Sequence, residues 1–332
     1  MLRVYFTSED LARVRVAPGP DFLWEISNSV QTLQRRDGER VFGAWRRWAR
    51  PRLSGSRRLL SGLLPPRGYS PDFLTPTSGD RTTMQAAVDT LMSTPRSRLR
   101  AELTRLSSSS RLPGWVGSLA RGDREALHRL GDALHAYRRE ALEPHWQRVH
   151  AHIDADRALR LHSLLDGGTE GLLTGLGPHF RWRPPVLEVT YPVDQQLRLE
   201  GRGLVLQPSF FCWPAPITLA DGDLPPVLVH PIHHNADWAG TASDDRATAA
   251  AGPLGPLLGQ TRAGVLRAAR TGCSTVEAAR LLEVTHPAVS QHLNVLRAAG
   301  LITTVRRAGR AFHVATAEGR ALLATEERAV RP

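Results

Sequence analysis

The sequence contains no lysine, so all 43 basic residues of this 332-residue chain are arginines. It has two cysteines, Cys212 and Cys273, which are too few and too far apart to indicate a disulfide framework. No run approaches the ~20 consecutive apolar residues of a membrane helix, and the N-terminus MLRVYFTSEDL lacks the pattern of a signal peptide. We therefore expect a cytoplasmic protein without a membrane partner.

The composition is that of a folded protein with a strong positive charge. Hydrophobic residues make up 41% and charged residues 23% of the chain, and its length allows more than one hydrophobic core. The preference for arginine over lysine fits the codon bias of a GC-rich genome. The formal net charge of +11 is a separate matter, because a strongly basic protein is attracted to nucleic acids or anionic surfaces.

The last quarter of the chain predicts two consecutive helices and a tight turn. Apolar residues from Leu258 to Ala269 recur at helical spacing, and Gly272 ends this first helix. Ser274 and Glu277 have the spacing of a capping box, in which each side chain bonds the other residue's backbone N–H. A second helix is therefore expected from this box to the tight turn at Leu282-Glu283-Val284.

A third helix and a β-hairpin follow. Thr285 is the expected N-cap, Pro287 falls in the first turn, and Gly300 is the expected left-handed cap at the end. The apolar positions expected to be buried are Val289, Leu293 and Leu296. The runs LITTVRR and AFHVATA, joined through Ala308-Gly309, predict a hairpin.

This order of elements predicts a winged helix-turn-helix, a fold whose third helix enters the major groove of double-stranded DNA. His286, Ser290 and Gln291 are expected to reach base edges, and the arginines of the wing are expected to bind phosphates or the minor groove. The full set expected to contact DNA is His286, Pro287, Ser290, Gln291, Asn294, Arg297, Arg306, Arg307 and Arg310.

The C-terminal sequence resembles the ArsR family of bacterial winged-helix repressors. The family pattern Ser-x-His-Leu-x-x-Leu-x-x-Ala-Gly-Leu is met here by Ser290, His292, Leu293, Leu296, Ala299, Gly300 and Leu301. The resemblance covers roughly the last 75 residues. It implies a homodimeric repressor that binds palindromic operators and is released by a ligand.

The resemblance does not extend to the metal sites of the family. One family site uses Cys-x-Cys on the second helix, but residues 275–282 contain no cysteine and Cys273 precedes them alone. Another uses Asp and His on the C-terminal helix, where this chain has Glu318, Glu326 and Glu327 without histidine. We therefore expect neither a metal nor another cofactor, and an organic effector instead.

The remaining sequence predicts a mainly helical N-terminal domain with a small antiparallel sheet, so the fold class is α+β. Helical patterns cover residues 22–36 and 40–53, return from 81 to 106, and continue from Asp123 towards Leu165 as one long helix. Strand-like runs cover residues 186–191, 196–200, 203–207 and 224–232. Gly201-Arg202-Gly203 is expected to form the turn between the second and third of them. We place the N-terminal domain at residues 1–232, a flexible linker at 233–256 and the winged helix at 257–332.

The N-terminal residues offer weak candidates for chemistry. His145, His150 and His152 do not share one helix face, and His233-His234 is a pair in a predicted loop. We expect no enzyme and interpret this domain as a sensor of a ligand or partner. Two alternatives stay open: an enzyme tethered by its winged helix, and an architectural DNA-binding protein without an effector. The arginines of residues 35–58 form a solvated face or extend the DNA contact.

Overall fold

The computed structural model describes residues 1–53, 55–77, 83–108, 112–234, 238, 254–270, 272–307 and 310–329. The chain divides into two compact units, residues 1–239 and 240–332. Helices and sheets are both present, which confirms the predicted α+β class. None of the helices in the described ranges is long and apolar enough to cross a membrane.

Helix α2 (Phe22–Gln34) of the N-terminal unit begins at the residue that its local sequence signal predicts. The carboxylate of Asp21 caps the helix at residues 22–34 by accepting hydrogen bonds from the backbone of Leu23 and Trp24 at 3.0 and 3.1 Å. The helices are α1 (Ser8–Ala12), α2 (Phe22–Gln34), α3 (Glu39–Ala49), α4 (Ser56–Ser61), α5 (Met84–Met92), α6 (Arg96–Ser107), α7 (Gly114–Ala120), α8 (Arg124–Tyr137) and α9 (Trp146–Thr174).

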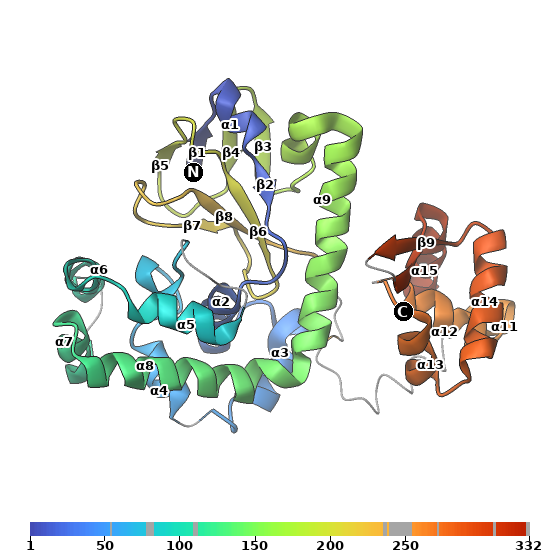
Figure 1. Ribbon diagram of the computed structural model, residues 1–332, viewed down its shortest axis with the longest axis horizontal. Coiled ribbons are helices and arrows are strands. Elements are labelled where there is room, and N and C mark those ends of the chain that lie inside the picture. Colours follow the sequence, from blue (N-terminus) through green and yellow to red (C-terminus); the bar gives the residue numbers. More distant parts are fainter. Residues whose placement is uncertain are drawn as a thin grey trace. The chain divides into compact units, whose positions relative to one another are not determined.

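The long helix predicted from Asp123 is two helices. A π-helical turn (Arg138–Leu142) and a 3-10 turn (Glu143–His145) separate α8 from α9, and the chain changes direction there (Figure 1). Pro144 lacks the N–H that would continue the α-helical pattern. The indole of the buried Trp45 donates to the carbonyl of Ala141 at 3.1 Å, so the altered turn is held from the side.

Two four-stranded mixed sheets occur within the described part of the unit. The first has the order β3-β4-β1-β5, and β1 pairs antiparallel with β4 but parallel with β5. The second has the order β2-β6-β8-β7, and β6 is parallel to both of its neighbours. The strands are β1 (Leu2–Tyr5), β2 (Arg15–Val16), β3 (Phe180–Arg183), β4 (Val186–Val189), β5 (Gln195–Arg198), β6 (Val205–Ser209), β7 (Ile217–Thr218) and β8 (Val227–Pro231).

The prediction of a small antiparallel sheet was therefore wrong in extent and in strand direction. The N-terminal strand β1 lies between β4 and β5 and is parallel to β5, which makes the first sheet mixed. The second sheet is mixed because β8 is parallel to β6 and antiparallel to β7, and β2 adds to its edge parallel to β6. Gly201-Arg202-Gly203 is not a hairpin turn, because β5 and β6 belong to different sheets. The backbone N–H of Gly203 instead donates to the buried carboxylate of Asp10 at 2.9 Å, which fixes the crossing between the sheets.

An aromatic cluster forms the centre of the helical core of this unit. Phe42, Trp45, Phe210, Phe211 and Trp238 are buried and pack against one another. Trp238 also donates its indole N–H to the carbonyl of Val41 at 2.6 Å. His234 lies against the same rings. Two residues of the segment predicted as a linker thus belong to the core of the N-terminal unit.

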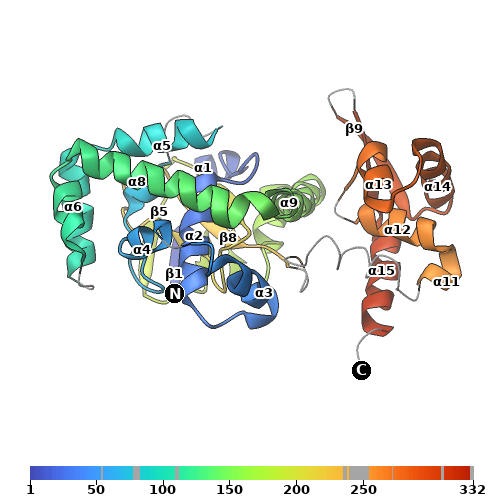
Figure 2. The same cartoon turned by 90° about the horizontal axis from the view of Figure 1, so that it is seen from below.

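The C-terminal unit is a small helical core with a two-stranded sheet (Figure 2). Its buried residues come from every helix and from both strands, so the helices and the hairpin share one core. Its elements are α11 (Leu254–Leu258), α12 (Gln260–Ala268), α13 (Thr275–Leu282), α14 (His286–Ala298), β9 (Ile302–Arg307), β10 (Arg310–Ala315) and α15 (Ala317–Ala329).

Candidate nucleic-acid interface

Local interactions fix both ends of α13, the helix that precedes α14. At the start of α13, the Ser274 hydroxyl accepts from the Glu277 N–H while the Glu277 carboxylate accepts from the Ser274 N–H at 2.7 Å. At its end, Glu283 has a left-handed backbone with φ of 54°, which turns the chain sharply into α14. The predicted capping box and tight turn are confirmed.

Helix α14 has one buried face and one polar face. Val289, Leu293 and Leu296 are buried, as the sequence predicts. The helix ends before Gly300, which has φ of +71°. Thr285 occupies the N-cap position, but its side chain makes no capping hydrogen bond. The predicted contact residues on this helix are all exposed: His286, Pro287, Ser290, Gln291, Asn294 and Arg297.

These exposed residues fall into two groups. The side chains of His286, Ser290 and Gln291, on the first two turns, make no hydrogen bond with any residue of the described ranges, so their donors and acceptors face solvent. Arg297, near the end of the helix, donates to the Asn294 side chain at 2.9 Å and to the Thr304 hydroxyl at 3.1 Å. The N-terminal part of α14 is therefore the part with free polar groups.

The wing is an antiparallel pair in which Arg307 lies opposite Arg310 and Arg306 opposite Ala311. The backbone of these three arginines is thus in strands β9 and β10, as predicted. Their side chains lie outside the part of the chain that the structure describes, and so do Ala308 and Gly309 between the strands.

A buried histidine that sequence reasoning missed joins the wing to the helices. His313 on β10 lies within hydrogen-bond distance of two hydroxyls, Thr304 on β9 at 3.0 Å and Thr275 on α13 at 3.1 Å. The Thr304 hydroxyl also accepts from Arg297 of α14. His313 is therefore a positioning residue that connects both strands of the hairpin with α13 and, through Thr304, with α14.

We expect His313→Phe to lower the free energy of unfolding of the C-terminal unit by about 1–3 kcal/mol, because two hydroxyls lose a partner. Burial and the nearby Arg297 lower the pKa of His313, so the unfolded chain binds its proton first and stability falls as the pH drops below 6.5. Thermal unfolding at pH 7 and pH 5 measures both effects. Thr304→Val should reproduce part of the loss, whereas an equal loss in Thr303→Val, exposed on the same strand, would contradict the role.

The side chains of Cys273, His145 and His150, considered as candidate metal ligands, are buried in a core or paired with another residue. Cys273 is buried in the core of the C-terminal unit, where burial raises the pKa of its thiol to about 12. His145 is buried between Trp48 and Trp238, while His150 pairs with Asp154 at 2.9 Å. The structure thus separates the histidines of this cluster. Within the described ranges, no three His, Cys, Asp or Glu side chains are arranged to hold a metal ion.

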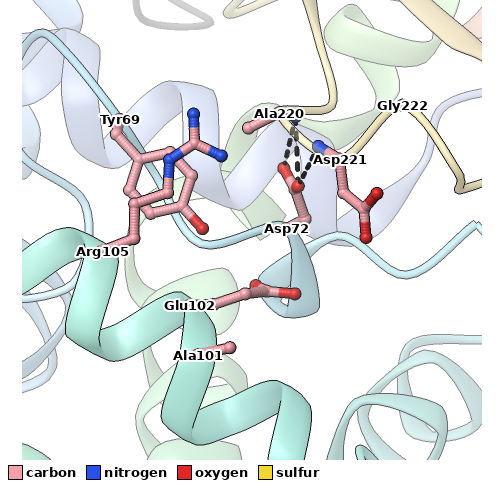
Figure 3. Close-up of a pocket in the computed structure, with 8 residues that line it drawn as sticks. All are labelled: Tyr69, Asp72, Ala101, Glu102, Arg105, Ala220, Asp221 and Gly222. Carbon is pink, nitrogen blue, oxygen red and sulfur yellow. Dashed lines mark hydrogen bonds between the residues drawn. The ribbon is translucent and has the colours of Figure 1, made fainter.

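A surface cavity of the N-terminal unit, with a volume of about 310 Å³, is lined by several polar side chains (Figure 3). The Asp72 carboxylate at its wall accepts from the backbone of Ala220 and Asp221 at 2.9–3.1 Å. Glu102 accepts from the backbone of Phe73 at 2.7 Å and pairs with Arg98. The two buried carboxylates are thus satisfied by the protein itself. The cavity is lined by Tyr69, Asp72, Ala101, Glu102, Arg105, Ala220, Asp221 and Gly222.

Comparison with known families agrees with the geometry of the C-terminal unit. A protein-family model described as a helix-turn-helix domain matches residues 258–305. The matched range contains α12, α13 and α14 and extends into β9. Searches of curated proteins and of solved structures found no match. The chain therefore carries a helix-turn-helix domain, followed by the second strand of a β-hairpin wing.

Proposed function

We propose that this protein is a DNA-binding transcriptional regulator that reads operator DNA with α14. The observation that carries the proposal is the free polar surface on the first two turns of a helix whose opposite face is anchored in the core. A helix of this kind fits the major groove with its N-terminal residues at the base edges. The helix-turn-helix match over the same residues supports the assignment.

The three side chains have distinct chemical uses in base recognition. Gln291 has both a donor and an acceptor and can bond adenine N6 and N7 together. The Ser290 hydroxyl donates or accepts, and His286, at the first helical position, can contact a base edge or a phosphate. Each well-made base contact contributes about 1–3 kcal/mol to discrimination, so these residues are sufficient for sequence preference.

The resemblance to ArsR repressors supports a finer form of the proposal. In this form the protein is a cytoplasmic homodimeric repressor that binds palindromic operators. In this scheme the N-terminal unit senses a small organic ligand or a partner. Such a ligand must bind the DNA-free protein better than the DNA-bound protein, since a ligand with equal affinity for both shifts nothing. The proposal assigns no catalytic step to the chain.

Fluorescence anisotropy with labelled duplexes tests base readout. We expect the wild-type protein to prefer DNA from upstream of its own gene over random DNA by a factor of ~10³ or more. The double variant Ser290→Ala/Gln291→Ala should lose most of this preference but keep its affinity for random DNA, because phosphate contacts remain.

Matched substitutions outside the interface control for this experiment. Ser107 and Gln147 are exposed on α6 and α9, so Ser107→Ala/Gln147→Ala makes the same chemical change at other places. This control should retain the full preference. Equal, steeply salt-dependent binding of the wild type to both duplexes would instead favour an architectural role or an operator elsewhere. Equal losses on both duplexes in the α14 variant would count against base readout.

A further inference from the structure

The net positive charge of the N-terminal unit is confined to residues 35–58. Residues 1–239 contain 31 arginines and 25 acidic residues. The segment 35–58 alone contains nine of these arginines and two of the acids, which gives +7 with histidine neutral. The other residues of the unit contain 22 arginines and 23 acids, a net charge of −1. Arginine is therefore abundant everywhere, but it is left unbalanced in one segment.

The structure exposes most of these arginines on and around α3. Arg40 and Arg47 are seven residues apart in α3 and lie on the same side of the helix, with the small exposed Ala44 between them. The Arg47 side chain is 71% exposed. We define the arginine surface by its exposed members, Arg36, Arg40, Arg47, Arg50, Arg52 and Arg58, on α3, on α4 and beside them.

The acidic residues of the segment neutralise only part of this charge. Glu39 pairs with Arg46 and with Arg47, the latter at 2.7 Å. Asp37 pairs with Arg35 and lies 3.6 Å from Arg67. Of the arginine surface, only Arg47 forms an ion pair with a residue in the described ranges. The other five guanidinium groups of this surface are therefore not paired with a carboxylate of the described residues.

Two of these arginines also contact aromatic or backbone groups that hold them in place. Arg52 stacks over the ring of Trp48, with its guanidinium carbon 4.7 Å from the ring centroid, and donates to the Trp48 carbonyl at 2.7 Å. Arg50, at the end of α3, donates to the Leu33 carbonyl at 3.1 Å. Part of the arginine surface is thus ordered before any partner binds, which lowers the entropy cost of binding.

We propose that the arginine surface binds the phosphate backbone of DNA and forms a second contact besides α14. The inference rests on the proposed function, which brings a DNA duplex to the chain. Guanidinium groups pair with phosphate in a bidentate geometry. The segment that carries this surface has a net charge of +7, whereas the other residues of the unit sum to −1, so the segment complements the charge of a duplex. Phosphate contacts add affinity without reading sequence.

Salt dependence distinguishes phosphate contacts from other losses of affinity. Each phosphate contact releases counterions and contributes about −0.9 to the slope of log K against log salt. Removing one contact therefore makes the slope less steep by about 0.9. We expect the full-length variant Arg36→Gln/Arg40→Gln/Arg47→Gln, called the α3 variant although Arg36 lies just before α3, to lower the magnitude of this slope by about 2–3. The affinity should drop by the same factor on upstream and on random DNA.

A charge-matched control separates a local contact from the loss of net charge. Arg100, Arg181 and Arg198 are exposed on α6, β3 and β5, away from α3 (Figure 1). The triple change Arg100→Gln/Arg181→Gln/Arg198→Gln removes the same charge and should leave the slope close to that of the wild type. Equal slopes for the wild type and the α3 variant, or equal reductions in both triple variants, would overturn the inference.

The same series keeps this inference separate from the proposed function. If Ser290→Ala/Gln291→Ala changes no sequence preference while the α3 variant lowers the salt slope, base readout fails and the phosphate contact stands. If the preference is lost as expected but the α3 variant keeps its slope, only the second contact fails. Binding to vesicles containing phosphatidylserine, lost in the α3 variant while DNA binding is unchanged, would assign the surface to a membrane and contradict the inference.

Discussion

Replacing Leu293 with alanine is expected to lower the free energy of unfolding of the C-terminal unit by about 2–5 kcal/mol. Leu293 lies in the middle of α14 and is only 2% exposed, between the buried Val289 and Leu296. A domain of this size has a total stability of roughly 5–14 kcal/mol. The change therefore removes a large share of the stability and, with it, the binding of DNA.

Calorimetry of the full-length protein tests this expectation, because the two compact units are each expected to unfold with their own transition. Leu293→Ala should lower only the transition of the C-terminal unit. Val295 lies on the same helix and is 41% exposed, so Val295→Ala should change the stability by no more than about 0.5 kcal/mol. A similar loss in both variants would mean that α14 is not anchored by the face described.

Acidification from pH 7 to pH 4 is expected to destabilise the N-terminal unit by several kcal/mol. Burial lowers the pKa of His145 to about 4, with a contribution from Arg148, and burial lowers the pKa of His234 to about 4 as well. Both have an ordinary value of 6.5. The unfolded chain therefore binds more protons between pH 6.5 and pH 4, and stability is lost as the pH falls through this range.

The size of the effect follows from the two shifts. Each corresponds to ~3 kcal/mol that is fully present above pH 6.5 and lost below pH 4. Glu25 acts in the opposite direction, since burial raises the pKa of its carboxyl to about 7 and folded protein then binds its proton first. Stability from this group is lost as the pH rises through 7, so it offsets part of the histidine effect between pH 7 and pH 4.5.

His145→Phe isolates one of the two histidines. His145 is 7% exposed, and neither ring nitrogen has a hydrogen-bond partner within the described residues, so phenylalanine removes the titration without breaking a bond. We expect this variant to retain ~3 kcal/mol more stability than the wild type at pH 4, relative to each protein at pH 7. Urea unfolding at the two pH values measures the difference. His128→Gln, an exposed change on α8, is the control; identical acid sensitivity of His145→Phe and the wild type would contradict the assignment.

The C-terminal unit was predictable because its signals are local. The capping box at Ser274 and Glu277, the spacing of Val289, Leu293 and Leu296, and the left-handed Gly300 all act within a few residues of the chain. A helix-turn-helix with a hairpin follows from these signals in order. The exposure of the N-terminal part of α14 follows from the same helical spacing.

The sheets of the N-terminal unit were not predictable in the same way. Leu2 pairs with Val189 on one side and with Gln195 on the other, so β1 is separated from both partners by more than half the chain. The local pattern of a strand is the same for parallel and antiparallel neighbours. Strand direction is decided by these distant pairings, which alternation along one strand does not encode.

Side-chain positions that depend on distant partners were also missed. In the sequence, His313 is one of several polar residues in a predicted strand, so nothing distinguishes it from its neighbours. Its role depends on Thr275 and Thr304, which the fold brings next to it. The positions of His234 and Trp238 also depend on residues that are distant in the sequence. Their sequence surroundings resemble a linker, but the side chains fit the aromatic core built by α3 and residues after β6.

Selection of bound duplexes from a randomised DNA library tests the central claim, base readout by α14, most directly, because the protein itself selects the operator sequence. The wild-type protein should enrich one sequence, and a homodimer should enrich an inverted repeat with half-sites about one helical turn apart. The Ser290→Ala/Gln291→Ala variant should enrich nothing, or a relaxed form of that sequence. Enrichment of no sequence by a wild-type protein that still binds the library would contradict the account.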